Sequence, residues 1–170
     1  FEIEVPDLIE DLSSDDKVVI VDTNNADELP STLSQANIIG IIDHHKFFGN
    51  ISTPGPIDVT IRPLASTASV IFEEALADFE LPKNIAQLIC ACIISDTLLF
   101  RSPTTTETDK SILEELAHEH SIDIQKLAEG MFAAKSDISH LSPDQIITYD
   151  AKQINVGGKD VHVCFHRYIS

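Results

Sequence analysis

The sequence predicts an α/β fold built on a parallel sheet, and three observations carry this prediction. Two short apolar runs, at residues 18–21 and 38–42, read as buried strands, and each leads directly into polar residues. A polar connection with a helical turn near residues 31–35 lies between them, and strand, helix, strand in this order implies a right-handed parallel crossover. Longer helical patterns follow from Ser66 onward. We therefore expect a parallel-sheet lobe with helices on both faces, followed by the start of a second α/β lobe.

The first part of the chain supplies the strands. Apolar residues at helical spacing predict a helix over residues 6–12, and the strands are expected at 17–22 and 38–43. Residues 57–61 alternate apolar and polar side chains, which predicts a half-exposed edge strand. Pro54, Gly55 and Pro56 separate this strand from the preceding loop.

The middle of the chain is predicted to be helical. A helix over 66–79 is capped by Ser66 or Thr67 and places Val70, Ile71, Ala75 and Leu76 on one stripe. A second helix over 83–94 is apolar nearly all round and should be buried between layers. Amphipathic helices follow at 105–120, with Thr105 or Thr106 as the cap, and at 124–134.

A polar stretch at 135–137 marks the expected boundary between the lobes, which gives a first lobe over 1–134 and the start of another over 138–170. The second lobe should open with a helix over 142–149, because Ser142-Pro143-Asp144-Gln145 has the pattern of a capping box. A β-hairpin over 152–165 should then turn at Gly157-Gly158.

Composition limits the function classes. The formal net charge of −17 over 170 residues argues against a broad nucleic-acid-binding face, and no apolar stretch is long and charge-free enough to cross a membrane. Cys90 and Cys92 lie in an apolar run and are expected to be reduced core thiols of a cytoplasmic protein. The chain has no initiator Met and ends without a following turn or helix, so we expect an internal segment of a longer protein.

The candidate chemistry lies where the predicted strands end. Asp22 follows the first strand and Asp43-His44-His45 ends the next, so carboxylate and imidazole groups should share one edge of the sheet and form a divalent-metal site. Asp96 ends the apolar helix, where the negative dipole end makes a carboxylate unfavourable unless a cation compensates it. In the alternative interpretations, Asp22 is only a turn former, and His44 and His45 are only surface residues.

These residues, together with the stretch Ser-Asp-Thr-Leu-Leu-Phe-Arg-Ser-Pro-Thr-Thr-Thr from Ser95, resemble the DHH phosphoesterase superfamily and, within it, the manganese-dependent family II inorganic pyrophosphatases. The resemblance covers essentially the whole chain. It implies a DHH-type first lobe and, in the second, the beginning of a DHHA2-type substrate lobe. Two expected segments, His-x-x-x-Asp-x-Asp and Ser-Arg-Lys, have no match here, which agrees with a chain truncated at both ends.

The resemblance also implies a role for each site residue. Asp22 matches a metal-bridging carboxylate, while His44 and Asp96 match further metal ligands. His45 matches a catalytic imidazole beside the substrate phosphate, and Asp43 a residue that orients the ligands. Lys152 aligns with a lysine of the second lobe that contacts the phosphate, although a lysine that begins a hairpin is usually solvated.

The implied reaction is hydrolysis of pyrophosphate to two orthophosphates by a water that two metal ions activate. Mixed imidazole and carboxylate ligands suit Mn²⁺ or Co²⁺, with Mg²⁺ accompanying the substrate. We expect a cytoplasmic homodimer with pyrophosphate as its small-molecule partner and no nucleic-acid or membrane partner, and we expect the segment alone to be inactive. Two alternatives remain open, namely a phosphodiesterase or exopolyphosphatase of the same superfamily, and a non-catalytic module with the same fold.

Overall fold

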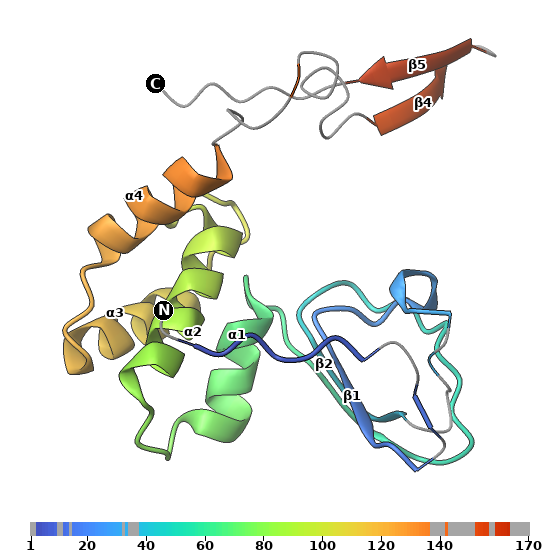
Figure 1. Ribbon diagram of the computed structural model, residues 1–170, viewed down its shortest axis with the longest axis horizontal. Helices are drawn as coiled ribbons and strands as arrows, with labels where there is room; N and C mark the ends of the chain where they lie inside the picture. The colour runs from blue at the N-terminus through green and yellow to red at the C-terminus, as the bar shows by residue number, and fades with distance from the viewer. Residues whose placement is uncertain are drawn as a thin grey trace. The chain divides into compact units, whose positions relative to one another are not determined.

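The computed structural model describes residues 3–9, 12–13, 15–31, 33, 38–136, 142, 152–156 and 159–163. The chain divides into two compact units, Phe1–Ala128 and Glu129–Ser170, and each is described by itself (Figure 1). The first unit contains a three-stranded sheet and most of the helices, and the second contains a two-stranded hairpin.

The sheet of the first unit is parallel throughout. Its strands are β1 (Val18–Val21), β2 (Ile38–Asp43) and β3 (Asp58–Ile61), in the order β1-β2-β3. Both pairs, β1 with β2 and β2 with β3, run parallel. The buried residues Ile20, Ile38 and Ile41 form a core cluster with Leu29, Leu33, Ile51 and Ile57 packed against it. The predicted parallel α/β fold is therefore confirmed, with β3 on the edge as expected.

The helix expected over residues 6–12 is wrong. Residues 3–9 and 12 have no helical structure, and the side chains of Leu8 and Ile9 are 87% and 68% exposed. A helix this short gains little from its own hydrogen bonds and needs a surface on which to bury its apolar face, which these side chains do not have here. The turn expected at 31–35 lies largely outside the described residues. The helical element described between β1 and β2 is instead a 3₁₀ turn, η1 (Ala26–Glu28), capped by Asn25.

The helices of the first unit pack on one another. Ser66 caps α1 (Thr67–Ile71), and α2 (Lys83–Thr97) and α3 (Glu107–Glu119) lie beside it (Figure 1). The helix α4 (Ile124–Lys135) follows and contains the boundary between the two units. The largest fully buried side chains of this core are Ile93 and Ile94 of α2 and Leu113 and Leu116 of α3. The apolar character of α2 is thus explained by burial, as predicted.

The predicted helix over 66–79 changes type after one and a half turns. A π-helical segment, η3 (Phe72–Leu76), follows α1 directly. A π turn holds more residues than an α turn, so it displaces every later side chain from the stripe that α-helical spacing predicts. Ala75, predicted to share the stripe with Val70, is accordingly exposed.

The end of α2 leads into a left-handed turn. The helix runs three residues beyond its predicted end, and Leu98, Leu99 and Phe100 then have φ angles of 49°, 52° and 65°. The buried hydroxyl of Thr97 donates to the carbonyl of Ile93 at 2.6 Å and accepts from the N–H of Phe100 at 3.3 Å. This hydroxyl therefore joins the last helical turn to the left-handed residues.

The two cysteines on α2 differ in exposure. Cys90 is buried, and burial raises the pKa of its thiol to about 11. Cys92 is exposed, so the prediction of two core thiols is correct only for Cys90. Positions i and i+2 of a helix point in different directions, and only one of them can face the core at this place.

The second unit contains the predicted hairpin. Strands β4 (Lys152–Val156) and β5 (Lys159–Val163) pair antiparallel, with Lys152 opposite Val163. The helix predicted over 142–149 lies outside the described residues, apart from Ser142. Among the described residues, no helix is long and apolar enough to cross a membrane.

Candidate metal centre

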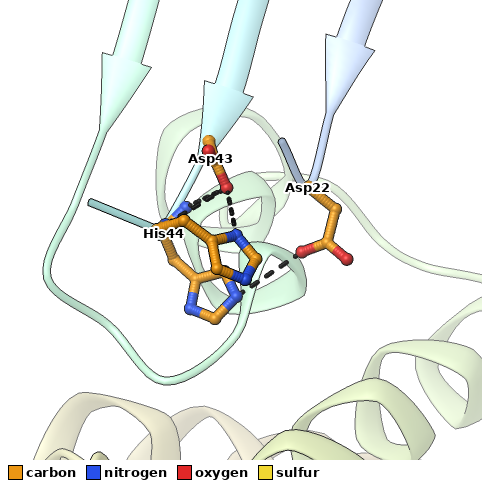
Figure 2. Close-up of side chains that lie close together, drawn as sticks. Asp22, Asp43 and His44 are labelled. Atoms are coloured by element: carbon orange, nitrogen blue, oxygen red, sulfur yellow. Dashed lines mark hydrogen bonds and ion pairs between the residues drawn. The ribbon is translucent and has the colours of Figure 1, made fainter. Parts of the chain in front are cut away.

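The carboxyl ends of β1 and β2 bring the predicted polar residues together. Asp22 follows β1 with a φ of 66°, a left-handed conformation that Asp adopts more readily than most residues. Its N–H donates to the carbonyl of Ile42 at 3.1 Å, which holds the end of β1 against β2. Figure 2 shows Asp22, Asp43 and His44 at these neighbouring strand ends. Because parallel strands end at the same edge, the side chains meet there.

His44 is held in one tautomer. Its Nδ1 lies 3.1 Å from the carbonyl oxygen of Leu64, and because a carbonyl only accepts, Nδ1 must carry the hydrogen. In the neutral ring, the lone pair is therefore on Nε2, which lies 3.5 Å from Oδ1 of Asp22 (Figure 2). A divalent cation placed beside these two electron-rich atoms would be attracted by both of them.

Asp43 is fully buried, and both oxygens of its carboxylate accept hydrogen bonds. Oδ1 accepts from the backbone N–H groups of His44 and His45 and from Nδ1 of His45, at 2.8, 3.2 and 2.8 Å. Oδ2 accepts from Asn24 at 2.6 Å. Burial by itself would raise the pKa of Asp43, but these hydrogen bonds outweigh it and lower the pKa. Asp43 is thus an ionised group that orients its neighbours.

The imidazole of His45 is oriented by Asp43. The bond from Nδ1 to Asp43 fixes the ring, which is about half exposed, and leaves Nε2 unengaged by that carboxylate. This hydrogen bond is the largest cause of a raised pKa at His45, partly opposed by burial and supported by the charges of Asp43, Asp22 and Glu28. The protonated imidazole is accordingly favoured relative to a free histidine.

Two supporting residues have roles that the sequence did not reveal. Asn24 is buried, donates to Asp43 and to the carbonyl of Lys46, and accepts from the N–H of Phe48 at 2.7 Å. The hydroxyl of Thr67, predicted only as a possible cap, donates to Oδ1 of Asp22 at 2.8 Å. The clue in the sequence for Asn24 was its place in the polar run after the first strand. For Thr67 the sequence offers no clue, since the contact spans 45 positions.

The residues fit a divalent cation. One ligand atom from each of Asp22, Asp43, His44 and His45 lies within 4.8 Å of the others. Since both oxygens of Asp43 are engaged, the carboxylate of Asp22 and Nε2 of His44 are the donors best placed to bind, with Nε2 of His45 nearby. The exposed carboxylate of Asp22 and the neutral imidazole nitrogen of His44 form the mixed oxygen and nitrogen set that suits first-row divalent metals such as manganese.

Asp96 is exposed near the end of α2 and does not belong to this group of four. It is nevertheless close to Cys92, one turn earlier on the helix. Although part of the Cys92 side chain is exposed, partial loss of solvent around the sulfur raises the pKa of its thiol, and the negative charges of Asp96 and Asp22 raise it further. The two carboxylates therefore act on the same thiol from different elements. Lys152, the predicted phosphate contact, is the first residue of β4 and belongs to the second unit.

A parallel sheet with acid and imidazole groups at its carboxyl edge defines an α/β protein with a candidate divalent-metal centre. The chain belongs to the DHH family: the model described as "DHH family, N-terminal domain" matches residues 2–93. This match covers β1, β2 and β3 with the whole group of four candidate ligands, and it ends within α2.

Comparison with individual proteins gives a narrower likeness. The chain is 38% identical over 167 residues to a Clostridium acetobutylicum protein named "Probable manganese-dependent inorganic pyrophosphatase", which covers 96% of this chain and 53% of the relative. A Staphylococcus carnosus protein of the same name is 34% identical over 164 residues, covering 96% and 53%. The chain thus spans about half the length of the curated relatives it matches.

A solved structure agrees in fold. The crystal structure of a Methanococcus jannaschii protein, assigned to the family II inorganic pyrophosphatases, matches with a TM-score of 0.74 and 35% identity, over 94% of this chain and 55% of the other. The α/β architecture predicted from the sequence is therefore shared with that protein.

Proposed function

We propose that the protein carrying this chain hydrolyses inorganic pyrophosphate to two orthophosphates in a manganese-dependent reaction. The observation that carries the proposal is the pairing of Nε2 of His44 with Oδ1 of Asp22 at 3.5 Å, beside His45, at the carboxyl edge of the sheet. The names of the similar proteins support this choice of metal and substrate.

In this proposal, Asp22, His44 and Asp96 hold manganese. Bound divalent metal would offset the charge of the substrate and lower the pKa of a water that attacks phosphorus. Thr67 keeps the carboxylate of Asp22 in place, and the carbonyl of Leu64 keeps Nε2 of His44 free of hydrogen for binding. Asp96 is included because the resemblance of the Ser95–Asp96 stretch to the family implies a metal ligand there.

His45 is proposed as the group that touches the substrate and donates a proton. Asp43 accepts from Nδ1, so Nε2 is the atom that faces the substrate. The hydrogen bond to Asp43 raises the pKa of His45, which increases the fraction of rings able to protonate the departing phosphate near neutral pH. A contact of Lys152 with the phosphate stays a prediction. Co²⁺ as an alternative metal, Mg²⁺ on the substrate, the homodimer and the cytoplasmic location stay predictions.

The test measures orthophosphate release from pyrophosphate by the complete protein, with and without Mn²⁺. We expect Mn²⁺-dependent release that falls by about 100-fold or more in Asp22→Asn. Asp27→Asn, an exposed carboxylate five residues away, is the matched control and should keep full activity. Mononucleotide release from a dinucleotide, or orthophosphate release from long polyphosphate with none from pyrophosphate, would favour the related phosphodiesterase or exopolyphosphatase. No hydrolysis of any of these with Mn²⁺ bound would favour a non-catalytic module.

A further inference from the structure

The peptide unit between Leu64 and Ala65 joins the candidate metal centre to a distant buried carboxylate. Its carbonyl oxygen accepts from Nδ1 of His44 at 3.1 Å. Its N–H donates to Asp109 on α3, at 3.0 Å to Oδ2 and 3.3 Å to Oδ1. One rigid, planar group is therefore bonded at one end to a proposed metal ligand and at the other to a negative charge.

Asp109 is built as a buried anion. Its side chain is fully buried, and it also accepts from the hydroxyl of Ser69 at 2.7 Å, the hydroxyl of Thr106 at 2.5 Å and the N–H of Thr106 at 3.0 Å. Burial would raise the pKa of Asp109, but these hydrogen bonds lower it, so the group is ionised. Among the residues that the structure describes, no ion pair involves Asp109, so its charge acts on the dipoles around it.

The charge of Asp109 strengthens the bond on the far side of the peptide. A carboxylate that accepts from an amide N–H polarises that amide and makes its carbonyl oxygen a better acceptor, and a low local dielectric increases the effect. The better acceptor at Leu64 holds the hydrogen on Nδ1 of His44 more firmly. The lone pair is then kept on Nε2, facing Asp22 at 3.5 Å. When the ring nitrogen that does not bind the metal, here Nδ1, has a hydrogen-bond partner, that partner fixes the tautomer of the histidine and increases the basicity of the ligating nitrogen.

We propose that Asp109 is a positioning residue for His44, acting through the Leu64–Ala65 peptide to keep Nε2 of His44 ready to bind metal. The metal-binding part of this inference rests on the proposed function, whereas the tautomer part concerns the metal-free chain. A merely structural role for Asp109 is the competing explanation, because Asp109 also completes the capping box of α3 with Thr106.

The first measurement is the tautomer of His44 in the metal-free chain, from the ¹⁵N shifts of its imidazole. We expect hydrogen on Nδ1 in the unsubstituted chain and a shift toward hydrogen on Nε2 in Asp109→Asn. That variant keeps the shape of the side chain, and the hydroxyls of Ser69 and Thr106 can rotate to accept from its amide. Thr106→Ala is the matched control, since it breaks the capping box and leaves the bond from Ala65 to Asp109 intact. An unchanged tautomer in Asp109→Asn would overturn the proposal.

A second variant keeps the test decisive if Asp109→Asn does not fold. Ser69→Ala removes one donor from Asp109, so the remaining charge should act more strongly on the N–H of Ala65. We expect the hydrogen bond from Nδ1 of His44 to become stronger, seen as a downfield shift of its proton. A weaker bond in Ser69→Ala would contradict the proposed direction of the effect.

The third measurement is Mn²⁺ affinity, followed by electron paramagnetic resonance of the free ion in the complete protein. We expect Asp109→Asn to bind Mn²⁺ about 10-fold or more weakly. Thr106→Ala, like Ser69→Ala, removes a hydroxyl donor from Asp109 and should bind Mn²⁺ no more weakly than the unsubstituted protein does. Equal affinity in both variants would overturn the metal-binding part. If the unsubstituted protein binds no Mn²⁺, the proposed function fails, and the tautomer measurement still decides the role of Asp109.

Discussion

The side-chain amide of Asn24 donates to the buried carboxylate of Asp43 at 2.6 Å, and this bond links the loop after β1 to the end of β2. The same side chain accepts from the N–H of Phe48 and donates to the carbonyl of Lys46. Asn24 thus holds the carboxylate of Asp43 before the two histidines and the backbone after them.

Replacing Asn24 should therefore destabilise the first unit markedly. Asn24→Ala leaves the N–H of Phe48 and one oxygen of Asp43 without their partner, and we expect a loss of about 2 to 4 kcal/mol in the free energy of unfolding. Urea denaturation measures it. Glu114→Ala is the control, because Glu114 is exposed on α3 and its loss should cost less than about 1 kcal/mol. Equal effects of the two substitutions would contradict the bracing role of Asn24.

The ionisation of His45 should depend on Asp43. An NMR titration of the metal-free chain is expected to give His45 a pKa above the ordinary value of 6.5, because Nδ1 donates to Asp43. Since the pKa is raised in the folded state, the resulting stabilisation is present below pH 6.5 and is lost as the pH rises through the folded value. In Asp43→Asn, the pKa of His45 should fall. A pKa that stays raised in this variant would assign the shift to other groups.

The reactivity of Cys92 tests whether the carboxylates of Asp22 and Asp96 both lie near its thiol. Both carboxylates raise the pKa of its thiol, so Asp22→Asn and Asp96→Asn should each increase the alkylation rate of Cys92 near pH 8 in the metal-free chain. Peptide mass spectrometry separates Cys92 from buried Cys90, which should react slowly. Asp123→Asn serves as a control that should leave the rate unchanged. If only Asp96→Asn accelerates the reaction, the charge of Asp22 does not reach the thiol, and the two carboxylates do not act on Cys92 together.

Acid should unfold the first unit partly by protonating Asp109. The pKa of Asp109 is lowered in the folded state, so its stabilisation is present above the ordinary value of 3.8 and is lost as the pH falls through the folded value. The difference in unfolding free energy between the unsubstituted chain and Asp109→Asn should shrink between about pH 6 and about pH 3, because the lowered pKa supplies that difference. Asp43 shifts in the same direction but is present in both proteins, so its contribution cancels. A constant difference over this range would contradict an ionised Asp109.

Much of the sheet and its polar edge could be predicted from local pattern. In the strand Ile38–Asp43, the apolar residues Ile38 and Ile41 are buried and polar residues follow directly. This change from apolar to polar correctly predicted that Asp43, His44 and His45 lie at the end of the strand. The placement of Asp22 beside them followed from the parallel crossover, since neighbouring parallel strands end together.

The remaining features depend on contacts that no local pattern contains. The residues that hold the site, Asn24, Thr67 and Asp109, act on partners 19 to 45 positions away, and short polar residues at such positions look like caps or turn formers. The helix expected at 6–12 failed because spacing alone does not supply a surface for burial. The π turn at Phe72–Leu76 displaced a stripe that α-helical spacing had predicted.

The left-handed residues Leu98, Leu99 and Phe100 limit which sequences can follow Asp96. A side chain in this conformation crowds its own backbone, and branching at Cβ makes the crowding worse. In a saturation mutagenesis library, glycine and asparagine should be accepted at these three positions, whereas valine, isoleucine and threonine should be depleted. The set of residues tolerated at these three positions would therefore report the left-handed backbone after α2. This readout does not depend on which ion or substrate the protein binds.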